Sequence, residues 1–229
     1  MSHHYISFKD VRYSYPDGHE ALRGISFRIN HGEKVALLGL NGAGKSTLLL
    51  HANGLLLPSS GEVNVGDVPV CKKTLKLVRR SVGMVFQNPD DQLFMPTVAE
   101  DVAFGPRNMS LPEEEVERRV SYALDAVGCG GLRDKSPAHL SGGQKRSISI
   151  ATVLSMEPDI LVMDEPTAGL DYAARRQVID IVSAFEHTCL IATHDLGLAR
   201  QLCPRSLLID HGRITADGDT EYVIKQLLH

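Results

Sequence analysis

A short glycine-rich segment most constrains what this chain can fold into, because it lies between a strand signal and a helix signal. Residues 34–38 (KVALL) form an apolar run that stops at Gly39, and a helical run follows from about Lys45 to Ala52. An apolar strand that leads through a glycine loop into a helix is the opening of an α/β unit. Ligands of such units bind beyond the carboxyl ends of the strands.

The loop from Gly39 to Ser46 (GLNGAGKS) fits the pattern GxxxxGK[ST], the P-loop. Its three glycines allow a tight concave turn whose backbone amides can wrap an oligophosphate, and the following helix points its positive N-terminal end at the same anion. Lys45 can reach the β- and γ-phosphates, and Ser46 can ligate Mg²⁺. The pattern therefore predicts a nucleotide site rather than a plain glycine-rich turn.

Strand and helix signals alternate along most of the chain, which predicts a largely parallel sheet. Residues 5–9 and 25–29 alternate apolar and polar positions, as half-buried strands do. The stretch from about 88 to 157 contains no convincing strand, so we expect a helical insertion there.

Capping boxes predict two helix starts inside this insertion. One joins Ser110 to Glu113 and the other joins Ser141 to Gln144. After the first, apolar residues recur at helical spacing up to a stop at Gly128.

Composition narrows the class of protein. The chain carries 24 basic and 28 acidic residues, a net charge of −4, which argues against a general nucleic-acid binder. Its four cysteines contain no CxxC pair, so we expect reduced thiols and neither a zinc ribbon nor a redox motif. No stretch approaches the roughly 18 apolar residues of a membrane span, so we do not expect this chain to cross a bilayer alone.

A second strand signal ends in two carboxylates. Residues 160–165 read ILVMDE, an apolar run that delivers Asp164 and Glu165 at its carboxyl end. Asp164 fits the Mg²⁺ carboxylate of P-loop nucleotide hydrolases. Glu165 is then placed to orient and polarise a water molecule, which is a general-base role.

Between these two motifs lies Leu140–Gln144 (LSGGQ), which resembles the signature of ABC-type ATPases. Other family elements have counterparts: Gln87 resembles the Q-loop glutamine, Gly169-Leu170-Asp171 the D-loop, and His194 the switch histidine. Tyr15 resembles the aromatic residue on which adenine stacks, with Tyr13 as a competitor. The resemblance extends from Ile6 to about Gly218.

The resemblance implies one ABC ATPase domain over residues 1–229. We expect a P-loop core, an antiparallel β part containing residues 5–30, and a helical subdomain at about 88–157. It implies two chains packed head to tail, each ATP lying between one P-loop and the partner's LSGGQ. Glu165, His194 and Gln87 are the implied catalytic residues, and Ser46, Gln87 and Asp164 the implied Mg²⁺ residues. The implied ATP-binding residues are Tyr15, Gly39, Asn41, Gly42, Ala43, Gly44, Lys45, Ser46, Thr47, Ser141, Gly142, Gly143, Gln144 and Asp171.

A finer resemblance involves residues 86–94 (FQNPDDQLF) and 100–108 (EDVAFGPRN). Both look like the ATPase subunits of energy-coupling-factor importers, especially the cobalt and nickel members. The alternatives are that these segments only bridge the core to the helices, that the importer carries a vitamin, or that the protein is a soluble ABC ATPase outside transport. The expected partners are ATP with Mg²⁺, a second copy or a paralogous ATPase, and integral-membrane subunits, without nucleic acid, at the cytoplasmic face of the membrane.

The segment after Gln87 is the expected contact with a membrane partner. Pro89 fixes one backbone angle and removes a donor. We expect the polar side chains of Asp91 and Gln92 to form an exposed groove edge instead of packing inward, with Leu93 and Phe94 as the apolar contact.

Overall fold

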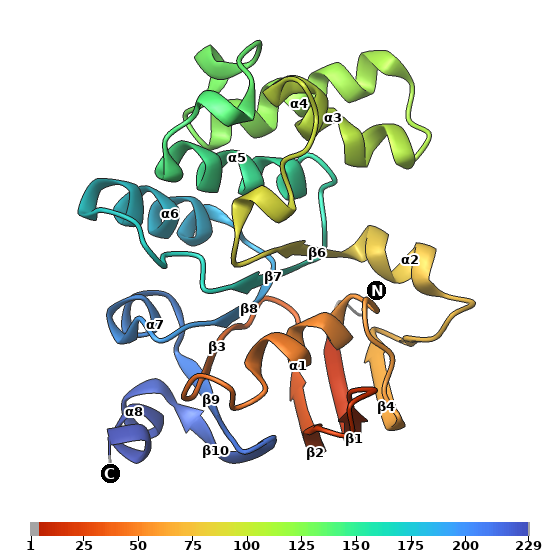
Figure 1. Cartoon of the computed structure of the whole chain (residues 1–229), viewed down its shortest axis with the longest axis vertical. Coiled ribbons are helices and arrows are strands. Elements are labelled where there is room, and N and C mark those ends of the chain that lie inside the picture. The colour runs from red at the N-terminus through yellow and green to blue at the C-terminus, as the bar shows by residue number, and fades with distance from the viewer. Residues whose placement is uncertain (1–4, 229) are drawn as a thin grey trace. The chain divides into compact units, whose positions relative to one another are not determined.

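The computed structural model describes residues 5–228, so the adjacent histidines His3 and His4 lie outside the described residues. The described chain divides into two compact units. The first comprises the chain up to residue 82, residues 159–165, and the chain from 186 onward. The second comprises residues 83–158 and 166–185. In Figure 1 the first unit runs from red to golden yellow at α2 and includes the teal β7 and the blue C-terminal part, whereas the second runs from yellow through green to cyan.

The first unit contains a four-stranded antiparallel sheet of strand order β2-β1-β4-β5. Apolar side chains on one face form its core, and Phe8 stacks on Phe27 with ring centroids 4.6 Å apart. Two strands were expected here, and both are longer than the alternating pattern indicated. The strands are β1 (Ile6–Ser14), β2 (Glu20–Ile29), β4 (Ser60–Val65) and β5 (Val68–Pro69).

A second sheet has the strand order β10-β9-β3-β8-β7-β6, and the chain passes from the first unit into the second within β6. Strand β3 pairs in parallel with β8 and β9, and β8 pairs in parallel with β7. Strands β7 and β8 are buried along their whole length, as expected of parallel strands covered on both faces. The strands are β3 (Lys34–Leu38), β6 (Val82–Val85), β7 (Ile160–Asp164), β8 (Thr188–Ala192), β9 (Arg205–Asp210) and β10 (Arg213–Asp219).

Among the described residues, four helices belong to the first unit. Helix α1 packs on β7 and β8, and α8 packs on β9 and β10 (Figure 1). The helices are α1 (Lys45–Ala52), α2 (Leu75–Ser81), α7 (Leu196–Leu202) and α8 (Thr220–Leu228).

The described residues of the second unit are mainly helical. Helices α3, α4 and α5 pack against one another, and α6 packs on α5. The α-helices are α3 (Val98–Asn108), α4 (Glu113–Ala126), α5 (Gly142–Leu154) and α6 (Tyr172–Ala184), and the 3-10 turns are η1 (Pro89–Asp91), η2 (Gly130–Leu132) and η3 (Pro137–His139). The predicted α/β class with an antiparallel β part is confirmed, whereas the extent of the helical subdomain stays a prediction.

One of the two predicted capping boxes is wrong. Helix α4 begins at Glu113 with Pro112 at its N-cap and no side-chain cap, while Ser110 adopts a positive φ of 60°. Proline restricts the residue before it to extended backbone, so the helix cannot start at Leu111 and Ser110 is too far away to cap it. The second box is confirmed: Ser141 caps α5 and pairs reciprocally with Gln144.

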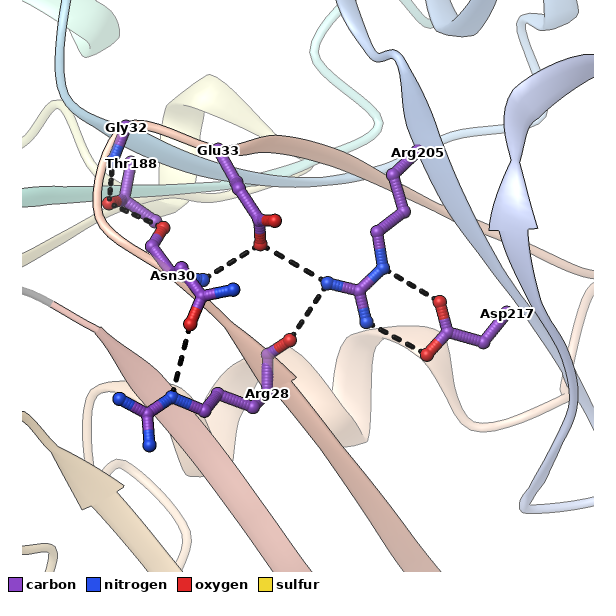
Figure 2. A network of polar contacts seen from close by, with 7 residues as sticks. All are labelled: Arg28, Asn30, Gly32, Glu33, Thr188, Arg205 and Asp217. Atoms are coloured by element: carbon purple, nitrogen blue, oxygen red, sulfur yellow. Dashed lines mark hydrogen bonds and ion pairs between the residues drawn. The ribbon is translucent and has the colours of Figure 1, made fainter.

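A network of polar contacts in the first unit lies at the N-terminal end of β3 (Figure 2). The guanidinium of Arg205 donates to both carboxylate oxygens of Asp217, at 2.7 and 2.8 Å, and to the backbone carbonyl of Arg28 at 2.9 Å. It also donates to Glu33 at 3.1 Å, and the same Glu33 oxygen accepts the Asn30 amide at 2.8 Å. One side chain therefore joins β9 to β10, to the end of β2 and to the start of β3.

We predict that Arg205→Met lowers the free energy of unfolding by about 1–3 kcal/mol, because three bonds to carboxylate oxygens and one bond to a backbone carbonyl are lost together. Arg213→Met is the matched control, since Arg213 is exposed on β10. Urea unfolding of both variants measures the difference. Equal effects of the two substitutions would contradict the role given to Arg205.

Candidate functional site

The P-loop follows β3 directly, and helix α1 begins at Lys45, as the sequence predicted. A side chain at Gly39 would place its Cβ 2.3 Å from the backbone oxygen of Ile209. A Cβ at Gly44, where φ is 109°, would lie 2.8 Å from the backbone oxygen of Ala21. Glycine is required at both positions, because the loop backbone approaches β9 and β2 too closely for any side chain.

The start of α1 suits an anion. The helix has no side-chain cap and no acidic residue in its first turn. Its N-terminal amides and partial positive charge are therefore not satisfied by a carboxylate of this turn. Asn41, Gly42 and Ser46 are exposed around it, whereas Ala43 and Thr47 are buried. These properties fit the predicted phosphate site.

Three charged or titratable side chains from different elements meet beside this loop. The Lys45 ammonium lies 3.8 Å from a carboxylate oxygen of Glu165 and donates to the carbonyls of Gly39 at 2.8 Å and Leu40 at 3.2 Å. The second Glu165 oxygen lies 2.7 Å from His194 Nδ1 and accepts the His194 backbone amide at 3.2 Å. The cluster therefore joins the helix after β3 to the ends of β7 and β8.

Glu165 combines an unusual backbone conformation with a buried side chain, as functional residues often do. Its φ is 46°, which is unusual for a residue other than glycine, and it is only 6% exposed. Its amide donates to the carbonyl of Ala192 on β8 at 2.9 Å, which holds this conformation. A buried carboxylate in strained backbone, paired to a lysine and a histidine, is a good candidate for the general base.

The side chains predicted to bind Mg²⁺ in the first unit carry oxygen donors. Asp164 is buried at the end of β7, and Ser46 is exposed in the first turn of α1. Carboxylate and hydroxyl oxygens are the hard donors that Mg²⁺ prefers, so these residues fit the ion. Their role as ligands stays a prediction.

Two tyrosines competed for the adenine contact. The Tyr15 hydroxyl forms a hydrogen bond of 2.8 Å with Thr47 Oγ1, so this ring lies against the first turn of α1. The Tyr13 ring instead packs edge-on against the fully buried His51, at a centroid distance of 4.8 Å. His51 is part of the core, and this burial lowers the pKa of its imidazole. The geometry favours Tyr15 as the platform.

The LSGGQ residues form the exposed start of α5 in the second unit. Ser141, Gly142 and Gln144 are exposed, and the space around a Cβ at Gly142 is open. A Cβ at Gly143 would lie 2.8 Å from that of Ala174 on α6, so glycine lets the two helices approach. Because α5 also starts without an acidic first turn, its N-terminus suits an anionic group.

Gln87 and Asp171 also belong to the second unit and are both exposed. The Asp171 carboxylate accepts the Ala174 amide at 2.8 Å and caps α6, a structural task that the sequence reading did not consider. Tyr172, which follows it, is 75% exposed at the first position of that helix. The roles of Gln87, Asp171 and the LSGGQ residues in an ATP site stay predictions.

Sequence reasoning missed Arg146, the largest fully buried side chain of the described residues. It lies on α5 and donates to the backbone carbonyls of Phe86, at 2.7 Å, and Gln87. An arginine two residues after LSGGQ is the one signal that the sequence offered.

The expected exposed edge after Gln87 is wrong in part. Gln92 is half-buried and bonded to α5, and Leu93 is buried. Asp91 is exposed as expected, and Phe94 is 61% exposed. Gln92 turns inward because the backbone amide of Phe86 and polar groups of α5 offer it partners.

The chain is similar in sequence to ABC transporter proteins over most of its length. The model of the ABC transporter family matches residues 22–168. The energy-coupling factor transporter ATP-binding protein EcfA of Methanocaldococcus jannaschii is 48% identical over 227 residues, covering 97% of this chain and 81% of the relative.

Two solved structures are similar over nearly the whole chain. CbiO1 of Clostridium perfringens, described as part of the ABC transporter complex cbiONQ, has a TM-score of 0.86 and 39% identity, and the match covers 100% of this chain and 93% of that one. The dimeric ATP-binding cassette MJ0796, in a post-hydrolysis state with ADP and Pi, has a TM-score of 0.84 and 27% identity, with 94% and 98% covered.

We predict that Lys45→Ala abolishes useful ATP hydrolysis and most ATP affinity, because a charge opposite the developing negative charge of the γ-phosphate is lost from a preorganised site. Nucleotide titration and phosphate release by the purified protein measure both quantities. Near-normal turnover would remove the P-loop assignment.

We predict that Glu165→Gln keeps ATP binding but lowers hydrolysis by roughly 10²–10⁴, as for loss of a general base. The amide retains the shape of the side chain without the carboxylate charge, so dimers should accumulate with ATP and Mg²⁺. Size-exclusion chromatography and phosphate release test this. A monomeric variant with normal hydrolysis would refute the role of Glu165.

Proposed function

Because the chain belongs to the ABC transporter family and is an ABC-type ATPase, we propose that it energises an energy-coupling-factor importer, most specifically one for divalent cobalt or nickel ions. The observation that carries this proposal is the run FQNPDDQLF after β6, together with the likeness to EcfA and CbiO1 over the whole chain. The transported solute would contact other subunits, so this chain supplies the energy and not the recognition.

In this proposal the first unit binds and hydrolyses ATP. Lys45 and the amides at the start of α1 hold the phosphates, and the Tyr15 ring takes the adenine. Ser46 and Asp164 of this unit would hold Mg²⁺, which would supply positive charge against the phosphates. Glu165 polarises the attacking water, and its bond to His194 supports an acid–base pairing at this position.

We infer that two chains act as a head-to-tail pair. Each chain carries one P-loop and one LSGGQ, which lie in different units, and the LSGGQ helix start is exposed and free of acidic side chains in its first turn. Such a start suits a phosphate presented by another chain. The dimeric state of MJ0796 supports this arrangement for relatives. One complete set of motifs makes a homodimer sufficient, and a paralogous ATPase is the alternative partner.

The membrane contact is proposed on the second unit. Phe94 and Phe104 are exposed aromatic rings that meet edge to face at 5.0 Å. Exposed aromatic pairs of this kind are characteristic of interaction surfaces. We assign this pair, with the exposed Asp91 that precedes Phe94 in the chain, to a short helix of a transmembrane subunit. Over residues 5–228, every helix is too short or too polar to span a bilayer.

We predict that Asp91→Ala combined with Phe94→Ala leaves ATP affinity of the purified chain within about twofold, because neither side chain lies in the predicted phosphate site. Uptake by cells that express all importer components should fall at least about tenfold, the effect of losing a packed aromatic contact. Gln92 is left unchanged because it packs inward.

Cells are supplied with Co²⁺, Ni²⁺ or biotin in separate arms, so the same assay decides between metal and vitamin transport. Tyr222→Ala, which removes another exposed aromatic, is the control and should leave uptake unchanged. Unchanged uptake in the double variant would reduce FQNPDDQLF to a structural bridge. Collapse of nucleotide affinity would assign the segment to the ATP site instead.

A further inference from the structure

Gln92 is held by three hydrogen bonds that use its whole carboxamide. Its Oε1 accepts the backbone amide of Phe86 at 3.1 Å. Its Nε2 donates to the carbonyl of Ser149 at 2.7 Å and to Thr152 Oγ1 at 2.8 Å. Both donor hydrogens and the acceptor therefore have partners, one on the strand-to-loop junction before Gln87 and two on helix α5.

The same helix holds the rest of this segment. Arg146, only 2% exposed, donates to the carbonyls of Phe86 and Gln87. Lys145 forms an ion pair of 2.6 Å with Asp90. Helix α5 therefore contacts this segment at three places. Arg146 binds its start at Phe86 and Gln87, Lys145 binds Asp90 in its middle, and Ser149 and Thr152 bind Gln92 near its end.

The other side of the segment is anchored to α3. One oxygen of the buried Asp101 carboxylate accepts the amides of Phe94 and Met95, both at 3.0 Å. The segment from Phe86 to Met95 is thus clamped by α5 on one side and α3 on the other, and it contains both Gln87 and the exposed ring of Phe94.

We propose that Gln92 is a positioning residue for ATP hydrolysis, which fixes the Gln87 loop to the helix that begins with Ser141–Gln144. Its carboxamide is the one side chain of the segment that binds the Phe86 amide and α5 at once. Movement of the Gln87 loop therefore requires movement of α5, and the residues predicted to serve two different ATP molecules move as one body. This inference rests on the proposed roles of Gln87 and LSGGQ.

Glutamine is the residue type that this position requires. Methionine has a similar length and shape but can make none of the three bonds. Glutamate keeps the acceptor for Phe86 but directs a carboxylate at the Ser149 carbonyl. Asparagine is one methylene shorter and cannot reach both sides.

The test is steady-state ATP hydrolysis by the purified full chain. Gln92→Met should lower kcat about tenfold, which corresponds to a loss of about 1.4 kcal/mol of transition-state stabilisation. KM for ATP should stay within about twofold, because the P-loop belongs to the other unit. Gln201→Met, the same change at an exposed position of α7, should alter neither value.

A double-mutant cycle with Thr152→Val tests the route of the effect. Thr152→Val alone should lower kcat about threefold but should add nothing in the Gln92→Met background, because Thr152 acts through its bond to Gln92. Thr152→Val also keeps the proposal testable if Gln92→Met fails to fold. Assays run at least 15 °C below the melting temperature of each variant separate positioning from stability.

Three results would overturn the inference: unchanged kcat with a lowered melting temperature, raised KM with unchanged kcat, or additive effects in the cycle. The importer assignment is tested separately by uptake. Loss of kcat in Gln92→Met with no importer activity for any solute would leave this inference standing and remove the transport proposal.

Discussion

The site of the first unit depends on the pairing of the buried Glu165 carboxylate with Lys45 and His194. A charge at this depth is costly unless it is paired and hydrogen-bonded, and its partners come from two other elements. Lys45 comes from the helix after β3, and His194 follows β8. The three groups meet only because β3, β8 and β7 are neighbouring parallel strands whose carboxyl ends share one edge of the sheet. The strand order of the sheet therefore brings the three side chains together. The surrounding contacts hold Glu165 in its positive-φ conformation.

The start of β3, at the opposite end of the strand from the P-loop, is held by the Arg205 network. That network joins both sheets of the first unit through charge-assisted bonds at the edge far from the P-loop along β3. Stability and chemistry are thus separated along the strands. A loop that must bind and release a nucleotide needs freedom, whereas the other end of each strand can be rigid.

In the second unit, helix α5 takes the organising role. Its first turn presents the LSGGQ residues, its buried Arg146 holds the Gln87 backbone, and Ser149 and Thr152 hold Gln92. Gly143 gives α6, with its Asp171 cap, a close approach to the same helix. The helix whose first turn carries the LSGGQ residues therefore also binds, through its later turns, the loop between the predicted ATP and membrane contacts.

The sequence by itself determined the elements and motifs that depend on neighbouring residues. The strand KVALL, the helix from Lys45 and the Ser141 capping box follow from apolar runs and short-range hydrogen bonds, and each was found where it was predicted. Helix α3 lies inside the predicted helical insertion, although it was not predicted as a separate helix. The Ser110 box failed because Pro112 decides where α4 begins. The inward turn of Gln92 and the burial of Arg146 were decided only by tertiary structure. The α5 partners of Gln92 and the Phe86 carbonyl bound by Arg146 lie 57 to 60 residues away in the chain. A polar side chain is expected to be exposed on sequence grounds until a distant polar group is brought within hydrogen-bonding reach.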